Sequence, residues 1–199
     1  MYIFFSAAHF IFIITIIVSI IGFINRNILH KFIFKPYNVI KEKKIYLFLT
    51  SGIIHADIKH LLFNMLTFYF FAFDLERTIG ELYFTCIYIG SLIISHIPTF
   101  LKHKNNKNYS SLGASGAISG IIFSSILIYP TNKIMILPIP LPLPSYVFGI
   151  IYILWGIIAN KKANDNINHI AHISGAISGI IISFILFGNT IINIWQKLI

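Results

Sequence analysis

The sequence predicts an all-α membrane protein, a bundle of six transmembrane helices forming a single domain over 1–199. Of its residues, 57% are hydrophobic and 11% are charged, whereas soluble domains average roughly 45–50% and 25%. Only 6 Asp and Glu are present, too few to cover a water-facing surface. Long charge-free stretches are instead suited to crossing a bilayer, which takes about 20 helical residues.

Charge-free runs place the six spans at about 2–24, 60–78, 80–101, 112–128, 146–159 and 170–188. The first span lacks the positive start and the small-residue cleavage site of a signal peptide, so we expect it to be retained. The second is the least regular, because Asp74, Glu76 and Arg77 follow its apolar part. Their long side chains would have to reach the interface.

The connections between spans differ in character. A long basic connection covers 25–59, and polar turns follow the third and fifth spans. Between Tyr129 and Ser145, five prolines remove backbone donors and prevent a continuous helix. We therefore expect an extended connector there. After the sixth span, Trp195 and Lys197 suit the membrane interface.

Composition narrows the functional class. The single Cys86 excludes an internal disulfide and cysteine-based metal centres. The zinc motif HExxH and a pair of membrane aspartates are both missing, so we expect no metal and no cofactor. The net charge of +9 favours contact with anionic lipid of the bilayer. We expect no nucleic-acid partner, because basic residues interleaved with aromatics do not occur on a soluble segment.

Polar residues gather at the starts of the even-numbered spans, which all enter the membrane from the same side. His60 and Asn64 open the second span. Ser115 lies about three residues into the fourth span, and His172 about two into the sixth. That is only about 3–5 Å below the helix starts. We expect these side chains to converge on a shallow pocket that water can reach.

Ser115 and His172 have the chemistry of a catalytic dyad. A serine hydroxyl becomes a good nucleophile when a neighbouring base takes its proton, and histidine is the usual base near neutral pH. The side chains of His60 and Asn64, together with backbone N–H groups at a helix start, would stabilise an oxyanion. The four residues therefore predict hydrolysis by acyl transfer.

Glycines favour close approach of the two helices that carry this dyad. Gly116 and Gly120 follow the serine, while Gly175 and Gly179 follow the histidine, each pair spaced four residues apart. Gly113 belongs to the same small-residue segment. In lipid, small residues at this spacing let helix backbones approach one another.

Each candidate also has a structural interpretation. Taken alone, the segment 113–116 would be a packing motif, and Asn64 would hydrogen-bond across helices. An intramembrane histidine would equally suit a metal, proton or cation pathway. His169 is a rival base, although it lies nearer the loop, while His9 and His96 have no partner in this scheme. The occurrence of the candidates on one side of three helices favours the hydrolytic site.

These residues resemble the pattern of the rhomboid intramembrane serine proteases, in which two histidines and an asparagine precede GxSG and then AHxxGxxxG. The three elements occur in order as His55, His60 and Asn64; Gly113, Ala114, Ser115 and Gly116; and Ala171, His172, Gly175 and Gly179. The match extends to Leu75, Glu76, Arg77 and Gly80 and to the proline-rich connector. It covers the chain from about Ile45 onward.

The resemblance implies an endopeptidase with Ser115 as nucleophile and His172 as general base. His60, Asn64 and the Ser115 backbone N–H would stabilise the oxyanion. It also implies single-span membrane proteins as substrates and a location in the bacterial inner (plasma) membrane. Two alternatives stay open: a rhomboid-like protein that binds membrane clients without cutting them, and a small transporter or channel.

Three features depart from what the resemblance implies. Ser119 stands one turn after Ser115, where many members place an aromatic beneath the histidine ring, and Tyr46 and Leu47 replace a Trp-Arg pair of the first loop. Twelve of the 15 Lys and Arg lie in loops one, three and five, so the positive-inside rule places the active-site face in the cytoplasm. Bacterial members with six spans have that face outward, and we expect the family orientation.

Overall fold

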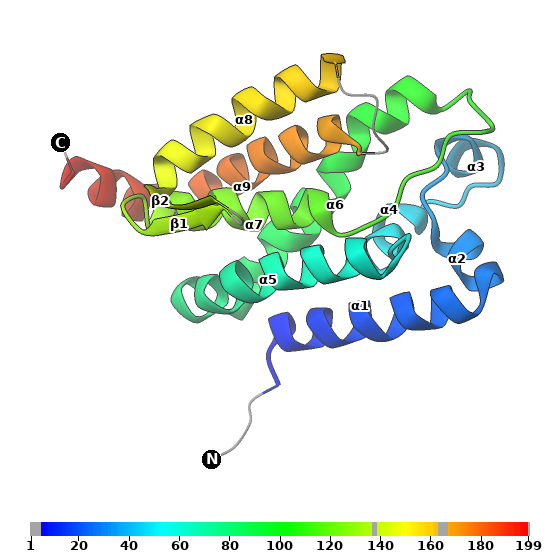
Figure 1. The fold of residues 1–199 in the computed structure, drawn as a ribbon, viewed down its shortest axis with the longest axis horizontal. Coiled ribbons are helices and arrows are strands. Elements are labelled where there is room, and N and C mark those ends of the chain that lie inside the picture. The colour runs from blue at the N-terminus through cyan, green and yellow to red at the C-terminus, as the bar shows by residue number, and fades with distance from the viewer. Residues whose placement is uncertain (1–4, 137–138, 163–166, 199) are drawn as a thin grey trace.

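The computed structural model describes residues 5–136, 139–162 and 167–198, which form a helical bundle with one small hairpin (Figure 1). Within this part of the chain, six helices have 14 or more residues. They are α1 (Ala7–Ile24), α5 (Ile58–Ile79), α6 (Glu81–His103), α7 (Ser115–Ile128), α8 (Ser145–Lys162) and α9 (His169–Gln196). These helices correspond in order to the six predicted spans, although the first residues of the first span lie outside the described residues.

Three of these helices, α1, α6 and α9, are long and apolar enough to cross a membrane, counting only the described residues. The apolar helices at Ser115–Ile128 and Ser145–Lys161 are shorter. Helix α5 has the length but carries charged residues near both ends. Length and composition therefore identify half of the predicted spans directly.

The dyad-bearing helices begin at other residues than predicted. Helix α7 starts at Ser115 and not at 112, because Gly113 has a φ of +110°, a left-handed conformation that interrupts a helix. Ser115 is therefore the first helical residue. Helix α9 starts at His169 and continues past the predicted end at 188 to Gln196, with non-helical angles at Phe187 (φ −148°, ψ 38°).

The basic connection 25–59, predicted as a loop, contains short helices. These are α2 (Arg26–Phe32), α3 (Pro36–Lys41), α4 (Leu47–Thr50) and a 3-10 turn, η1 (Ser51–Ile53). Helices this short show too few turns for a periodic pattern to be recognised. These short helices were not predicted from the sequence.

An aromatic cluster anchors this first loop to α6, in the absence of the Trp-Arg pair. Phe34 is fully buried and packs edge-on against Phe48 and the ring of His96, at centroid distances of 4.9 and 4.4 Å. Phe48 in turn packs against Phe100 at 5.7 Å. Because His96 and Phe100 belong to α6, the loop is fixed to a long helix next to the site.

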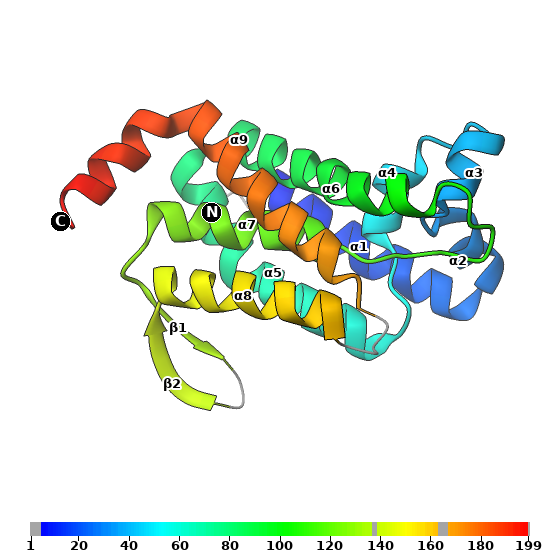
Figure 2. The ribbon, with the colours of Figure 1, turned by 90° about the horizontal axis from the view of Figure 1, so that it is seen from above.

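The proline-rich connector is extended, as predicted, but it also pairs with itself. Strand β1 (Lys133–Ile136) runs antiparallel to β2 (Ile139–Pro144), with an irregular register after Met135. Alternate prolines in β2 lack donors on one edge only, so the residues between them can still pair. The all-α class therefore needs this one correction, a hairpin that projects from the bundle (Figure 2).

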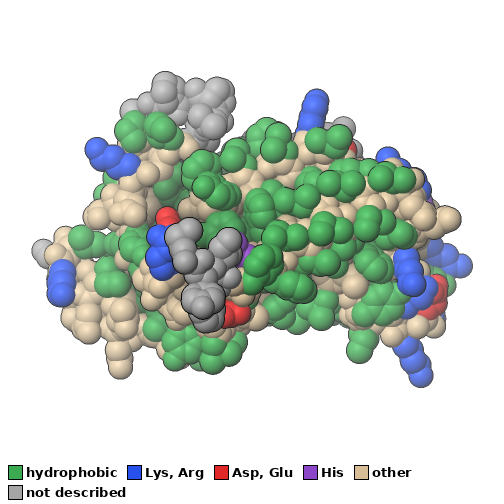
Figure 3. Space-filling view, turned by 90° about the horizontal axis from the view of Figure 1, so that it is seen from below, with side chains coloured by type: hydrophobic (Ala, Val, Ile, Leu, Met, Phe, Trp, Pro, Cys, Tyr) green, Lys and Arg blue, Asp and Glu red, His purple; other side chains and the backbone are tan. Residues whose placement is uncertain are grey.

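Helix α7 lies in the middle of the bundle, where it contacts α5, α6, α8 and α9. Nearly all of its residues are buried. The outer helices instead expose large apolar side chains, including Phe63 and Phe70 of α5 and Trp155 of α8. Figure 3 shows hydrophobic side chains along the middle of one face, with Lys and Arg mainly at the end that holds the basic connection. Such a surface suits contact with lipid.

Helix α1 is tied to α5 and its preceding loop at both ends. At one end, the backbone N–H of Ala8 donates to the carboxylate of the buried Glu76 at 2.9 Å, and the Ser6 hydroxyl donates to the same carboxylate. At the other end, Ser19 is hydrogen-bonded to His55 at 3.0 Å. The second of these links leads directly to the site.

Candidate active site

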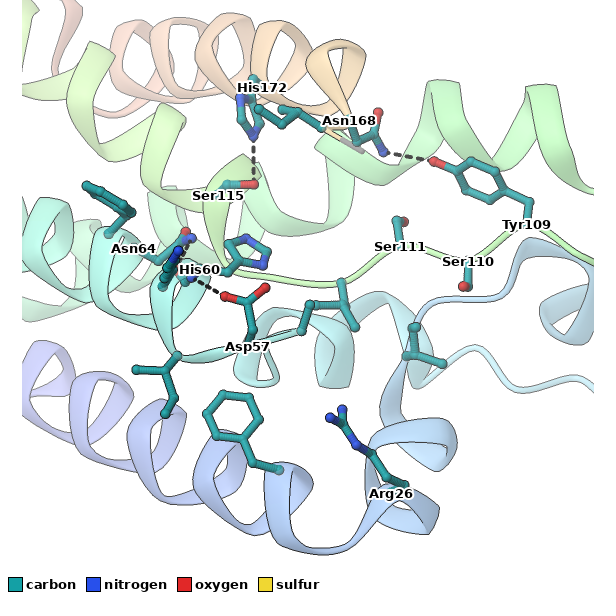
Figure 4. Close-up of a pocket in the computed structure, with 18 of the residues that line it drawn as sticks. Arg26, Asp57, His60, Asn64, Tyr109, Ser110, Ser111, Ser115, Asn168 and His172 are labelled. Carbon is teal, nitrogen blue, oxygen red and sulfur yellow. Dashed lines mark hydrogen bonds between the residues drawn. The ribbon is translucent and has the colours of Figure 1, made fainter. Parts of the chain in front are cut away.

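An open cavity of about 1490 Å³ lies among the starts of α5, α7 and α9 and the loops beside them. The four predicted polar residues His60, Asn64, Ser115 and His172 all line it (Figure 4). With 14 residues, α7 is about 21 Å long, shorter than the ~30 Å hydrocarbon core. Its first residue, Ser115, lies at the wall of the cavity.

Ser115 and His172 point toward each other across the cavity wall (Figure 4). The Nε2 atom of His172 lies 2.8 Å from Oγ of Ser115, a normal hydrogen-bond distance. Both side chains are partly exposed. The pair is therefore placed for proton transfer from the hydroxyl to the imidazole.

The backbones of α7 and α9 touch directly at glycines, which brings Ser115 and His172 within hydrogen-bond distance. A Cβ atom added at Gly175 would collide with the carbonyl of Gly116, and one added at Gly179 would collide with that of Gly120. On its other side α7 meets α6, where Ser91 would block a side chain at Gly120. No residue larger than glycine fits these positions without a shift of the backbone.

The residues proposed for the oxyanion lie on the first turns of α5. Asp57 caps this helix by accepting the backbone N–H of His60 at 2.9 Å, and Asn64 donates from Nδ2 to the His60 carbonyl at 2.9 Å. A Cβ atom at Gly113 would lie 2.7 Å from the His60 ring. The ring therefore packs directly on the segment that leads into Ser115.

His55 is hydrogen-bonded to the segment just before Ser115. Its ring is fully buried, and its Nε2 accepts the backbone N–H of Ala114 at 3.4 Å. Nδ1 therefore carries the proton and donates to Ser19, whose hydroxyl donates to the Ile53 carbonyl at 3.3 Å. Burial, and secondarily the nearby His60, lowers the pKa of His55 to about 3. The ring is thus neutral and links α1 to the residue before Ser115.

Asn168 holds the start of α9. It caps the helix by accepting the backbone N–H of Ala171 at 3.2 Å. Its Nδ2 donates to Thr99 of α6 at 2.9 Å and to the hydroxyl of Tyr109 at 3.3 Å. Burial raises the pKa of Tyr109, which keeps this phenol protonated. The helix turn that carries His172 is thereby joined to α6 and to the loop after it.

The other histidines lie apart from Ser115. The rival base His169 is buried and packs edge-on against Trp155 of α8, at a centroid distance of 5.2 Å. His96 is bonded to the Leu92 carbonyl and to Ser51, and His9 to Ser6. Among the described residues no group of three or more His, Cys, Asp or Glu is placed to hold a metal ion.

The fold and the site define a class, a helical membrane protein that carries a serine–histidine pair in an open cavity. The sequence model of the Rhomboid domain matches residues 42–189. The chain therefore belongs to the rhomboid family, and with its apolar helices it is an integral membrane protein.

Similar proteins include bacterial and mitochondrial members. The chain is 32% identical to the Bacillus subtilis rhomboid protein YdcA over 145 residues, covering 69% of this chain and 65% of YdcA. It is 26% identical to RHOMBOID-like protein 12, mitochondrial, of Arabidopsis thaliana, covering 68% and 45%. It is 30% identical to Rhomboid protease GluP of B. subtilis, covering 79% and 29%. The matches thus span less than two thirds of these relatives.

Proposed function

We propose that the protein is an intramembrane serine endopeptidase that cleaves the transmembrane segments of single-span membrane proteins. The observation that carries this proposal is the 2.8 Å separation of His172 Nε2 and Ser115 Oγ at the wall of an open cavity. Family membership and the similarity to a relative named as a rhomboid protease support it.

The reaction follows the usual course of acyl transfer. Ser115 Oγ attacks the scissile carbonyl carbon while His172 takes the hydroxyl proton. The backbone N–H of Ser115 and side chains of His60 and Asn64 stabilise the resulting oxyanion. His172 then gives its proton to the leaving amine. Water, deprotonated by the same ring, attacks the acyl carbon, and His172 returns that proton to Ser115 Oγ as the acid product leaves. His172 is thus the proton acceptor and donor in every step of this reaction.

We also propose that α5, α7 and α8 are membrane spans, which gives six in total. The cavity then faces outward from the inner membrane of a bacterium, with both termini inside. The match between these helices and the charge-free runs supports the first point. The orientation follows the family pattern, against the distribution of Lys and Arg.

Replacing either dyad residue tests the proposed function. Ser115→Ala and His172→Ala are each expected to abolish cleavage of a single-span test substrate, as judged on gels with purified protein in liposomes. Ser125→Ala removes a hydroxyl from the same helix away from the cavity and serves as the matched control. Full activity in either dyad variant would refute the assignment.

A graded variant and an activity probe extend this series. Asn64→Ala is expected to reduce turnover partially, because other oxyanion donors stay in place. A fluorophosphonate should label wild type and not Ser115→Ala. A protein that binds single-span clients without being labelled or cutting would fit the non-catalytic alternative, and flux across liposomes without hydrolysis would fit a transporter.

A further inference from the structure

Ser119 and Tyr152 form a partly buried polar contact between α7 and α8. The Ser119 hydroxyl lies 2.7 Å from the hydroxyl of Tyr152 and 2.8 Å from the backbone carbonyl of Ser115. A carbonyl can only accept, so the single proton of Ser119 goes to Ser115. The Tyr152 hydroxyl must then donate to Ser119. The result is a directed chain from α8 through Ser119 to the backbone of the nucleophile.

This chain of hydrogen bonds reaches a helix start that has no side-chain cap. The N-cap of α7 is Ala114, which offers no side-chain hydrogen bond to the first turn, although such a bond ordinarily fixes the first residues of a helix. His55 holds the backbone just before Ser115. The Ser119 hydroxyl, one turn further on, donates to the carbonyl of Ser115.

The ring of Tyr152 is placed independently of its hydroxyl. It packs edge-on against Phe123 of α7 at a centroid distance of 5.6 Å and lies 5.9 Å from Phe148. The Tyr152 hydroxyl finds its hydrogen-bond partner in Ser119, which is only 1% exposed. Removal of the hydroxyl alone would therefore interrupt the chain and leave the ring in its contacts.

We propose that Tyr152 is a positioning residue, which fixes the nucleophile through Ser119. This inference rests on the proposed function. At the position where many family members place an aromatic, this chain has Ser119, whose hydroxyl is bonded to Tyr152 of the neighbouring helix α8. Consecutive hydrogen bonds of this kind polarise and strengthen one another. The Tyr152 hydroxyl thus helps to fix the position of Ser115 without touching the substrate.

The test uses Tyr152→Phe, Ser119→Ala and the double variant of the full-length protein in liposomes. Each single variant is expected to lower kcat about five-fold, the rate equivalent of one net hydrogen bond. KM should be unchanged, since the chain does not reach the substrate. The rate of fluorophosphonate labelling should fall with kcat. Because the two hydroxyls act in series, the double variant should be no slower than the slower single variant. Tyr146→Phe, on an exposed position of α8, is the matched control.

The possible outcomes separate this inference from the proposed function. An active wild type whose kcat is unchanged by Tyr152→Phe would overturn the positioning role alone. So would single effects that multiply in the double variant, or an equal loss in Tyr146→Phe. A wild type that neither cuts the substrate nor reacts with the probe would overturn the proposed function and this inference with it.

Discussion

At the residue scale, His55 joins parts of the chain that are distant in sequence. Its two ring nitrogens bond Ser19 of α1 and the backbone of Ala114, next to Ser115. Only the neutral ring can accept the Ala114 N–H at Nε2. A second proton on the ring would break that bond and leave a charge in a fully buried position.

The neutral His55 predicts a pH dependence of stability. Its pKa is about 3 in the folded protein and about 6.5 when unfolded. Between these values the unfolded state binds the extra proton, so the free energy of unfolding falls as pH falls below 6.5, by up to about 1.4 kcal/mol per pH unit. The thermal unfolding midpoint in detergent, followed by tryptophan fluorescence, should therefore drop less steeply between pH 7 and 5 in His55→Gln than in wild type. Equal slopes would contradict this account, and the exposed His30→Gln should behave as wild type.

Sequence reasoning found the residues of the site whose positions follow a pattern. His60, Asn64, Ser115 and His172 were selected from their place near helix starts on one side, and all four line the cavity. The partners that hold them were missed. Ser19 and Tyr152 reach the site only through tertiary contacts, and their spacing along the chain carries no signal. Asn168 caps α9 four residues before His172, and an asparagine before an apolar run is a helix-start signal that could have found it. Ser119 was noticed as a departure, but its bond to Tyr152 needed the structure.

At the element scale, contact between α7 and α9 is the tightest helix pairing near the site. The positions where backbones touch were predicted from glycine spacing alone, since only a missing side chain permits that approach. The exact helix starts were not predictable in this way. They depend on the left-handed Gly113 and on the cap supplied by Asn168.

Gly175→Ala tests the importance of this contact. The added Cβ would collide with the Gly116 carbonyl, and overpacking of this kind costs about 1–3 kcal/mol. We expect a lower unfolding midpoint and loss of cleavage, because α9 must move and carry His172 away from Ser115. Gly188→Ala is the control on the same helix, where the Cβ would meet Phe184 at an ordinary 3.6 Å. A stable and active Gly175→Ala would show that the contact is dispensable.

At the scale of the whole molecule, the bundle and its order of helices follow from the hydrophobic runs, whereas the hairpin and the short helices of the first loop do not. Hydrophobic runs report burial in lipid or protein over about 20 residues. They do not indicate that a strand with prolines at alternate positions can pair with its neighbour. They also do not indicate helices of only one or two turns. Orientation is a further property of the whole chain, and here charge and family pattern point to opposite sides.

Labelling of single cysteines settles the orientation. In a Cys86→Ser background, cysteine is placed at Lys107, in the loop after α6, or at Lys133, in the hairpin at the opposite end of the bundle (Figure 1). With the cavity facing outward, an impermeant maleimide added to intact cells should label Lys107→Cys. Lys133→Cys should react only after permeabilisation. The reverse pattern would establish that the positive-inside rule decides.

The glycine contact between α7 and α9 also limits the routes by which a substrate could approach. Because the two backbones touch without side chains between them, separating α7 from α9 would be costly, and Ser115 and His172 would move together. A membrane segment cleaved as proposed would therefore enter past α5 or α8, whose outward surfaces expose large hydrophobic side chains able to contact another membrane helix.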